Sequence, residues 1–230
     1  MTFHCFFEQS GTFKKEFKKL GYKAFDYDIL NDFGQTDYVV DLFHDIEVAY
    51  EREREKERTV FDNVKEGDQI IAFFPCIRFS NQIYMHFQGN MKSIKEWSDE
   101  KKLEYDIKLH TELHHLYVLI SKLVVICLRR NIPLIIENPY SQEHYLTRYW
   151  AVKPLVIDLD RRDRGDYFKK PTQYWFFNRK PSNNLIIEDI RAEKTKRITA
   201  KVEDGGINNK AERSLISPVY AKRFIKEFII

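Results

Sequence analysis

Two residues with chemically useful side chains each follow a short apolar run in this sequence. Residues 70–74 lead into Cys76, and residues 134–136 lead into Glu137. A cysteine thiolate is a strong nucleophile, and a carboxyl group can donate or accept a proton beside it. This pairing favours covalent catalysis with acid–base assistance. The alternative for Cys76 is that it is a small buried hydrophobic residue, which is the usual place of a free cysteine.

Both apolar runs have the length and composition of buried parallel strands. Pro75 and Pro139 mark where they end, because proline has no N–H group to donate to a strand ladder. The carboxyl ends of neighbouring parallel strands meet at one edge of a sheet, where open α/β sheets bind ligands. We therefore expect Cys76 and Glu137 to face one pocket.

The first 28 residues predict a strand–turn–helix–strand unit. The strand lies in residues 1–9, the helix spans 13–20, and the second strand covers 22–27. This is the opening half of a Rossmann-like fold, but its turn has one glycine where a dinucleotide-binding turn has three. An acid at the end of the second strand is suited to holding ribose hydroxyls, and Asp26 and Asp28 are both candidates. The alternative for either is an ordinary turn aspartate.

The remaining elements follow from apolar periodicity and capping residues. We expect a polar functional loop over 81–102 and a long helix over 103–130. We also expect a short strand at 38–40, a helix from about residue 46, a strand at 155–158 and a closing helix from Ser217-Pro218 to Ile230.

Basic residues alternate with aromatic residues in segment 161–175. Such a surface suits phosphates and stacked bases, although an exposed hairpin with a charged tip has the same pattern. The candidate nucleic-acid contacts are Arg161, Arg162, Arg164, Lys169, Lys170 and Thr172.

Composition limits the other functional classes. Lys and Arg total 38 against 35 acidic residues, a net charge of +3 that leans only weakly toward a polyanionic partner. Three widely spaced cysteines do not form a disulfide framework, and no apolar run reaches the length of a membrane span, so we expect a cytoplasmic protein without membrane attachment. His110 and His114 lie one helical turn apart but lack the H-E-x-x-H pattern, and we expect no metal site.

These motifs resemble the SAM-dependent DNA (cytosine-5)-methyltransferases, in particular short phage-type members. The family has P-C-Q-x-F-S after an apolar strand, and this chain has Pro75-Cys76-Ile77-Arg78-Phe79-Ser80. The family has E-N-V after a later strand, and this chain has Glu137-Asn138-Pro139, about 60 residues beyond Cys76. Residues 6–13, Phe-Phe-Glu-Gln-Ser-Gly-Thr-Phe, are similar to a reduced form of the first family motif, F-x-G-x-G-G-x.

The resemblance implies an α/β fold: a Rossmann-like sheet of the class I SAM-dependent methyltransferases with helices on both faces and a small C-terminal appendage. It implies a SAM-binding catalytic core in residues 1–150, a target-recognition segment in 151–215 and a closing helix in 216–230 that packs back on the core. SAM would be the cofactor and DNA the partner.

The resemblance also implies roles for single residues. Cys76 would attack carbon 6 of cytosine, Glu137 would donate to ring N3, Asn138 would orient the base or the glutamate, and Arg78 would help to lower the pKa of the thiol. The residues implied at the SAM site are Phe7, Ser10, Gly11, Thr12, Asp26, Asp28, Asp41 and Pro75.

Two other functions remain open from the sequence. One is a catalytically inactive relative that binds nucleic acid or a protein partner. The other is a different cysteine-dependent enzyme, for example one that acts on a free nucleotide.

Overall fold

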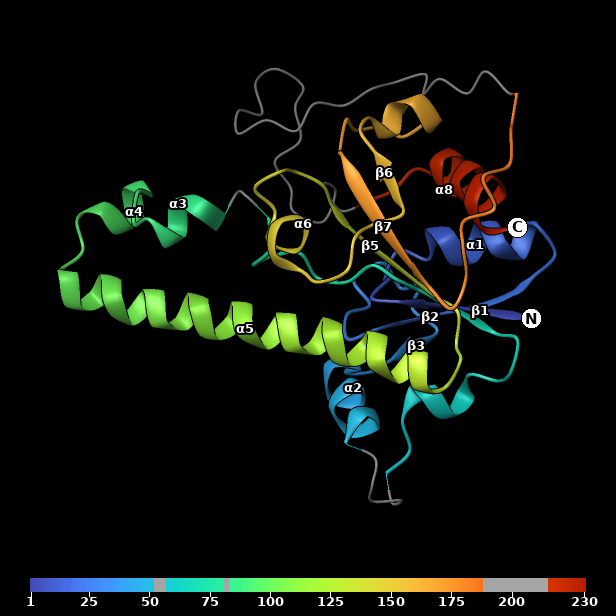
Figure 1. Cartoon of the computed structure of the whole chain (residues 1–230), viewed down its shortest axis with the longest axis horizontal. Coiled ribbons are helices and arrows are strands. Elements are labelled where there is room, and N and C mark those ends of the chain that lie inside the picture. Colours follow the sequence, from blue (N-terminus) through green and yellow to red (C-terminus); the bar gives the residue numbers. More distant parts are fainter. Residues whose placement is uncertain (52–56, 81–82, 188–214) are drawn as a thin grey trace.

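A computed structural model describes residues 1–51, 57–80, 83–187 and 215–230 of the chain. In these residues a seven-stranded mixed sheet, with the order β3-β2-β1-β4-β5-β7-β6, is flanked by helices on both faces (Figure 1). The predicted α/β class is confirmed. The strands are β1 (Thr2–Phe6), β2 (Lys23–Asp28), β3 (Tyr38–Val39), β4 (Gln69–Ala72), β5 (Leu134–Pro139), β6 (Val156–Asp158) and β7 (Thr172–Phe177).

Helices fill the connections between most of these strands. One of them, α5, is far longer than the rest and extends beyond the sheet (Figure 1). The helical elements are α1 (Thr12–Lys19), α2 (Leu42–Tyr50), η1 (Val60–Asn63), α3 (Tyr84–Phe87), α4 (Lys92–Lys95), α5 (Asp99–Arg129), α6 (Tyr145–Tyr149), η3 (Arg161–Arg164), α8 (Pro218–Phe224) and the π-helical turn η5 (Ile225–Ile229). Segment 81–102, expected to be a loop, thus contains the short helices α3 and α4.

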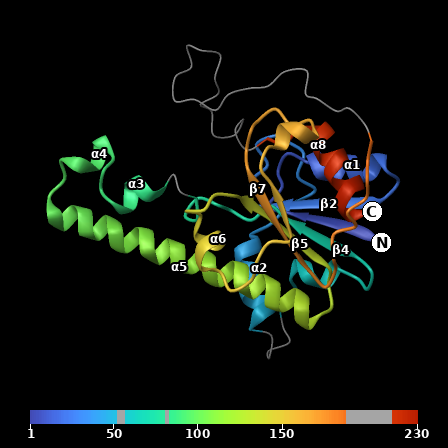
Figure 2. The same ribbon diagram turned by 45° about the horizontal axis from the view of Figure 1, so that its top comes forward.

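The sheet separates two apolar cores, and strand residues alternate between them because successive side chains point to opposite faces. Along β1, Phe3 and Cys5 join the core under α1 and α8, whereas Phe6 joins the core under α2 and α5. Figure 2 shows these two helix pairs on opposite sides of the sheet. In this three-layer arrangement helices cover both faces of the sheet, and the ends of the strands remain uncovered.

Helix starts follow capping side chains more closely than apolar periodicity. The helix expected from residue 46 begins at Leu42, because the Asp41 carboxylate accepts hydrogen bonds from the N–H groups of Phe43 (3.0 Å) and His44 (3.3 Å). Likewise α5 begins after Ser98, whose hydroxyl accepts from the N–H of Lys101.

The long helix α5 contains an apolar stretch that is long enough to cross a membrane. In this fold its second half instead packs on the sheet, and Leu119, Ile120 and Leu123 are fully buried there. A core helix of a folded domain can have the same length and the same apolar composition.

Residues 151–177 do not form an appendage separate from the core. Strand β7 pairs antiparallel with β5 over six residues, and β6 pairs antiparallel with β7, so the last two strands of the sheet come from this segment. The expected boundary at residue 150 is therefore wrong as a structural division. Part of the expected target-recognition segment, 188–214, lies outside the described residues.

Candidate functional site

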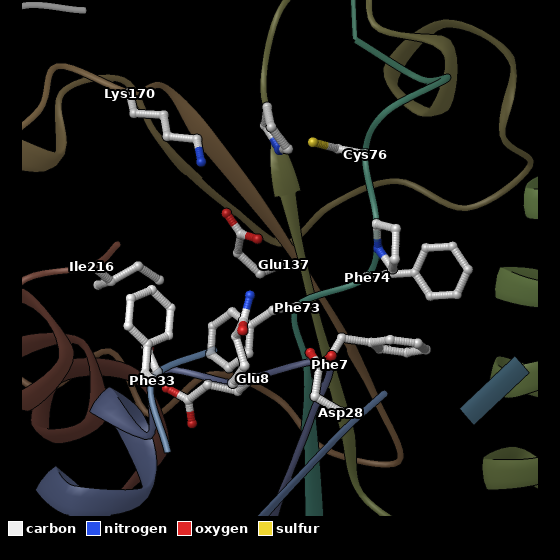
Figure 3. A pocket seen from close by; sticks show the side chains of 14 residues that line it. Phe7, Glu8, Asp28, Phe33, Phe73, Phe74, Cys76, Glu137, Lys170 and Ile216 are labelled. Carbon is white, nitrogen blue, oxygen red and sulfur yellow. The ribbon is translucent and has the colours of Figure 1, made fainter. Parts of the chain in front are cut away.

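Cys76 and Glu137 line one pocket at the carboxyl edge of the sheet (Figure 3). Strands β4 and β5 are parallel neighbours with Ala72 opposite Ile136, so their carboxyl ends lie together, as predicted. The pocket has a volume of about 230 Å³. A nucleophilic side chain and a carboxyl group thus reach the same enclosed space.

The pocket lies where the strand order reverses. β1 is followed outward by β2 and β3 on one side and by β4 and β5 on the other, and ligands of open α/β sheets bind at such a switch point. Its lining comes from the ends of four strands and from the turn before β7. The lining residues include Phe7, Glu8, Gln9 and Ser10 after β1, Asp28 of β2, Pro75 and Cys76 after β4, Glu137 and Pro139 of β5, and Lys170 before β7.

Asn138 fixes the backbone that carries Cys76. Its side-chain amide is fully buried and donates hydrogen bonds to the carbonyl oxygens of Phe74 (2.8 Å) and Glu137 (3.0 Å). Phe74 directly precedes Pro75-Cys76, so Asn138 ties the loop after β4 to the end of β5. Asn138 was expected to orient the base or the glutamate. Its side chain does not line the pocket, and it holds the backbone of Phe74 and of Glu137 instead.

Glu137 presents an unused acceptor to the pocket. The residue is 7% exposed, and its Oε1 atom is buried with no hydrogen-bond partner among the described residues. A buried polar atom without a partner costs free energy unless a ligand or water satisfies it. The free Oε1 atom of Glu137 is therefore available to a ligand group in the pocket.

Arg78 directs its guanidinium to Glu112 of α5, with Nε 2.5 Å from Oε2. Its side chain lines a second hollow of about 590 Å³, between the loop after Cys76 and α6, and does not line the pocket that holds Cys76. The expected contribution of Arg78 to the thiol pKa stays a prediction.

Asp28 is the better placed of the two candidate acids on β2. It lines the pocket at the end of its strand. Asp26 is fully buried and paired with Lys14, with 2.9 Å between Lys14 Nζ and Asp26 Oδ2. Since Asp37 lies 3.1 Å from the same ammonium, Asp26 belongs to an ion cluster within the protein, and it does not line the pocket.

Four of the eight expected cofactor residues line the pocket, namely Phe7, Ser10, Asp28 and Pro75. Gly11 instead starts α1 in the left-handed region, at φ 64°, where an added Cβ would lie 3.2 Å from Asp26 Oδ2. The Thr12 hydroxyl lies 3.1 Å from that of Ser10, and Asp41 caps α2. Gly11, Thr12 and Asp41 therefore shape neighbouring backbone and do not line the pocket.

Glu8 is a pocket residue whose importance the sequence prediction missed. Its carboxylate accepts hydrogen bonds from the N–H groups of Phe13 (2.7 Å) and Lys14 (3.3 Å), at the positive end of α1. Burial nevertheless raises the pKa of Glu8 to about 7. An acid a few residues before a helix start, within reach of its first N–H groups, is the sequence signal that would have identified it.

Most of the basic segment is neutralised within the protein. Arg161 is fully buried and paired with Asp166, so its expected contact with DNA is wrong. Arg164 binds Glu227 through Nη2 (2.9 Å) and Nε (3.1 Å). The other four candidate nucleic-acid contacts differ in their surroundings. Arg162 pairs with Asp160, and Thr172 is buried within β7. Lys169 is exposed, and Lys170 lines the pocket.

Within the described ranges, no group of three or more His, Cys, Asp or Glu side chains is arranged to hold a metal ion. His110 lies 3.5 Å from Asp106 on α5 and lines the second hollow.

No protein-family profile matches the chain, and no curated protein matches it.

Proposed function

We propose that this protein is a SAM-dependent methyltransferase that methylates carbon 5 of cytosine in DNA through a covalent adduct with Cys76. The observation that carries the proposal is the single pocket that brings together Cys76, Glu137, Asp28 and the segment after β1. Cys76, Glu137 and the segment after β1 come from the three regions on which the family resemblance rests. The switch point between β1 and β4 supports the Rossmann-like, SAM-binding sheet that the resemblance implies.

The chemistry requires a nucleophile and an acid on one ring. Carbon 5 of cytosine becomes nucleophilic when the Cys76 thiolate adds to carbon 6 and Glu137 donates a proton or hydrogen bond to N3. After methyl transfer, water would take the proton from carbon 5, and the electron pair left behind would expel the Cys76 thiolate. The proton or hydrogen bond at N3 would return to Glu137, which would restore the aromatic ring and the free cysteine. The base must leave the duplex to reach an enclosed pocket of this kind.

The pocket offers SAM several polar groups. Glu8, Asp28 and Glu137 contribute carboxyl groups, and Lys170 contributes one ammonium. SAM carries a sulfonium and an ammonium against one carboxylate, and when bound it supplies an electrophilic methyl group. Asp28 would hold the ribose hydroxyls, and Glu8 would face the methionine end.

A methyl-transfer assay tests the proposal. Purified protein is incubated with tritiated-methyl SAM and mixed-sequence DNA, in parallel with Cys76→Ala. Label should appear at carbon 5 of cytosine with the wild type and be absent with the variant, because the variant cannot form the adduct.

A control variant and two other outcomes complete the assay. Cys127→Ala changes a buried cysteine of α5 outside the pocket and should retain transfer. SAM binding without any transfer would support the inactive relative. Failure to bind SAM would contradict both the proposed methyltransferase and the inactive relative.

A further inference from the structure

The second hollow borders the same loop that carries Cys76. It has a volume of about 590 Å³, and residues of this loop, α3, α5 and α6 line it. Figure 1 shows α3 and α6 along the same side of α5. Pro75 and Cys76 line the first pocket, whereas Arg78 and Ser80 line the second hollow. One short loop therefore separates the two spaces.

Aromatic side chains line the second hollow from two sides. On α6, the ring centroids of Tyr145 and Tyr149 lie 5.2 Å apart, and Phe79 of the loop stacks on Tyr145 at 6.0 Å. Tyr84 and Phe87 line it from α3. Tyr149 is 62% exposed and Tyr84 is 56% exposed, so both rings have free surface. Such rings offer stacking faces to a planar ligand.

The charged side chains of this hollow are already paired within the protein. The Arg78 guanidinium binds Glu112, and Glu143 accepts a hydrogen bond from Arg148 at 2.7 Å. A hollow with aromatic walls and neutralised charges suits an uncharged planar ring better than a phosphate. The imidazole of His110 adds a hydrogen-bonding group for the edge of that ring. The chemical class that fits is a nucleobase.

A base next to the target is within reach of the second hollow. Arg78 follows Cys76 by two residues, so their backbones are at most about 7 Å apart. Successive bases on one strand of a duplex are about 3.4 Å apart along the helix axis, and unstacking separates them further. When the target base leaves the duplex, its neighbour loses a stacking partner and costs less to unstack.

We propose that the second hollow binds the base adjacent to the target cytosine on the same DNA strand, stacked on the ring of Tyr149. This inference rests on the proposed function. Tyr84, on α3, would contribute the second aromatic surface. The first pocket would then hold the base that reacts, and the second hollow would hold the strand in place beside it.

The test measures steady-state methyl transfer to mixed-sequence DNA by variants of the hollow. Tyr149→Leu keeps an apolar side chain and removes the ring, and it should raise KM for DNA about tenfold, within the usual effect of losing one base–aromatic stack. Tyr84→Leu should raise it in the same way. Tyr149→Phe keeps the ring and should stay within about twofold of the wild type, since stacking does not need the hydroxyl.

Three further measurements serve as controls. kcat should stay within about threefold in every variant, because the hollow holds no reacting atom. The Kd for SAM should not change. Tyr50→Leu, at the end of α2, changes a tyrosine that lines neither space and should leave KM for DNA within about twofold.

Oligonucleotides with one base removed identify the base that stacks. The cytosine methylated by the wild type is located first, and an abasic site then replaces either its 5′ or its 3′ neighbour. On one of these two oligonucleotides the wild type and Tyr149→Leu should have KM values within about twofold, because no base remains to stack. On the other, the tenfold difference should persist.

The inference is overturned if Tyr149→Leu and Tyr84→Leu, shown to be folded by thermal unfolding, keep the wild-type KM for DNA. It is also overturned if the defect of Tyr149→Leu persists on both abasic oligonucleotides, which would assign the hollow to another ligand or to a second copy of the chain. Absence of methyl transfer by the wild type would instead contradict the proposed function itself.

Discussion

Glu8 combines two opposing influences at one carboxyl group. The first N–H groups of α1 favour its charged form, whereas burial in the pocket disfavours it, and burial prevails. The native state therefore holds a proton on Glu8 more tightly than the unfolded chain does. Its contribution to stability is complete below pH 4.5 and is lost as pH rises through about 7.

Glu8→Gln should flatten this pH dependence, because glutamine still accepts from the N–H of Phe13 and carries no titratable group. Between pH 4.5 and 8, the wild type should lose about 3 kcal/mol more unfolding free energy than the variant, at about 1.4 kcal/mol per unit of pKa shift. Urea unfolding across that range measures the difference. Parallel stability curves for the two proteins would show that Glu8 does not titrate in this range.

At the scale of elements, a cluster of ion pairs joins α8 to the strands that end the sheet. Arg164 of η3 binds Glu227 of η5, and its Nη1 atom lies 3.2 Å from Asp158 of β6. Asp158 is 3% exposed, and Tyr220 of α8 donates a hydrogen bond to it (3.0 Å). This cluster fastens the C-terminal helix beside the turn that carries Lys170.

Arg164→Met should destabilise the protein by about 3 kcal/mol, because it leaves the Asp158 carboxylate buried without its cation. Arg162→Met is the matched control two residues away. In the ion pair of Arg162 with Asp160 the arginine side chain is exposed to solvent. The loss of unfolding free energy should therefore be below about 0.5 kcal/mol. Urea unfolding at pH 7 measures both, and equal losses would contradict the assignment of Arg164 as the structural cation.

The sequence predicted which residues lie close together where they follow neighbouring parallel strands. It did not predict contacts that depend on the pairing of strands far apart in the chain. The apolar runs before Cys76 and Glu137 were sufficient to predict two adjacent parallel strands and a shared pocket. The antiparallel insertion of β7 beside β5 was not predictable, since no local pattern specifies the partner of a strand. That pairing is what brings Lys170 into the pocket.

The surroundings of charged residues were likewise not predictable from the sequence. Arg161 and Arg162 are adjacent in a run of alternating charge, yet Arg161 is fully buried against Asp166 and Arg162 faces solvent. Residue type cannot separate a structural cation from a ligand-binding one, because the difference lies in which carboxylate the fold brings near. Asp41 shows the same point, because the helix that it caps was expected only from about residue 46 and Asp41 itself was assigned to the SAM site.

The proposed function of the whole molecule requires that the pocket at the switch point hold a pyrimidine that Cys76 attacks covalently. The most direct measurement uses DNA in which cytosine is replaced by 5-fluorocytosine. Fluorine on carbon 5 cannot leave as a proton does, so the adduct persists after methyl transfer. With SAM present, the account predicts a protein–DNA complex that survives denaturation, with the modified base located on Cys76 by mass spectrometry of the digested complex. Methyl transfer to DNA with no such complex, or attachment through another residue, would contradict it.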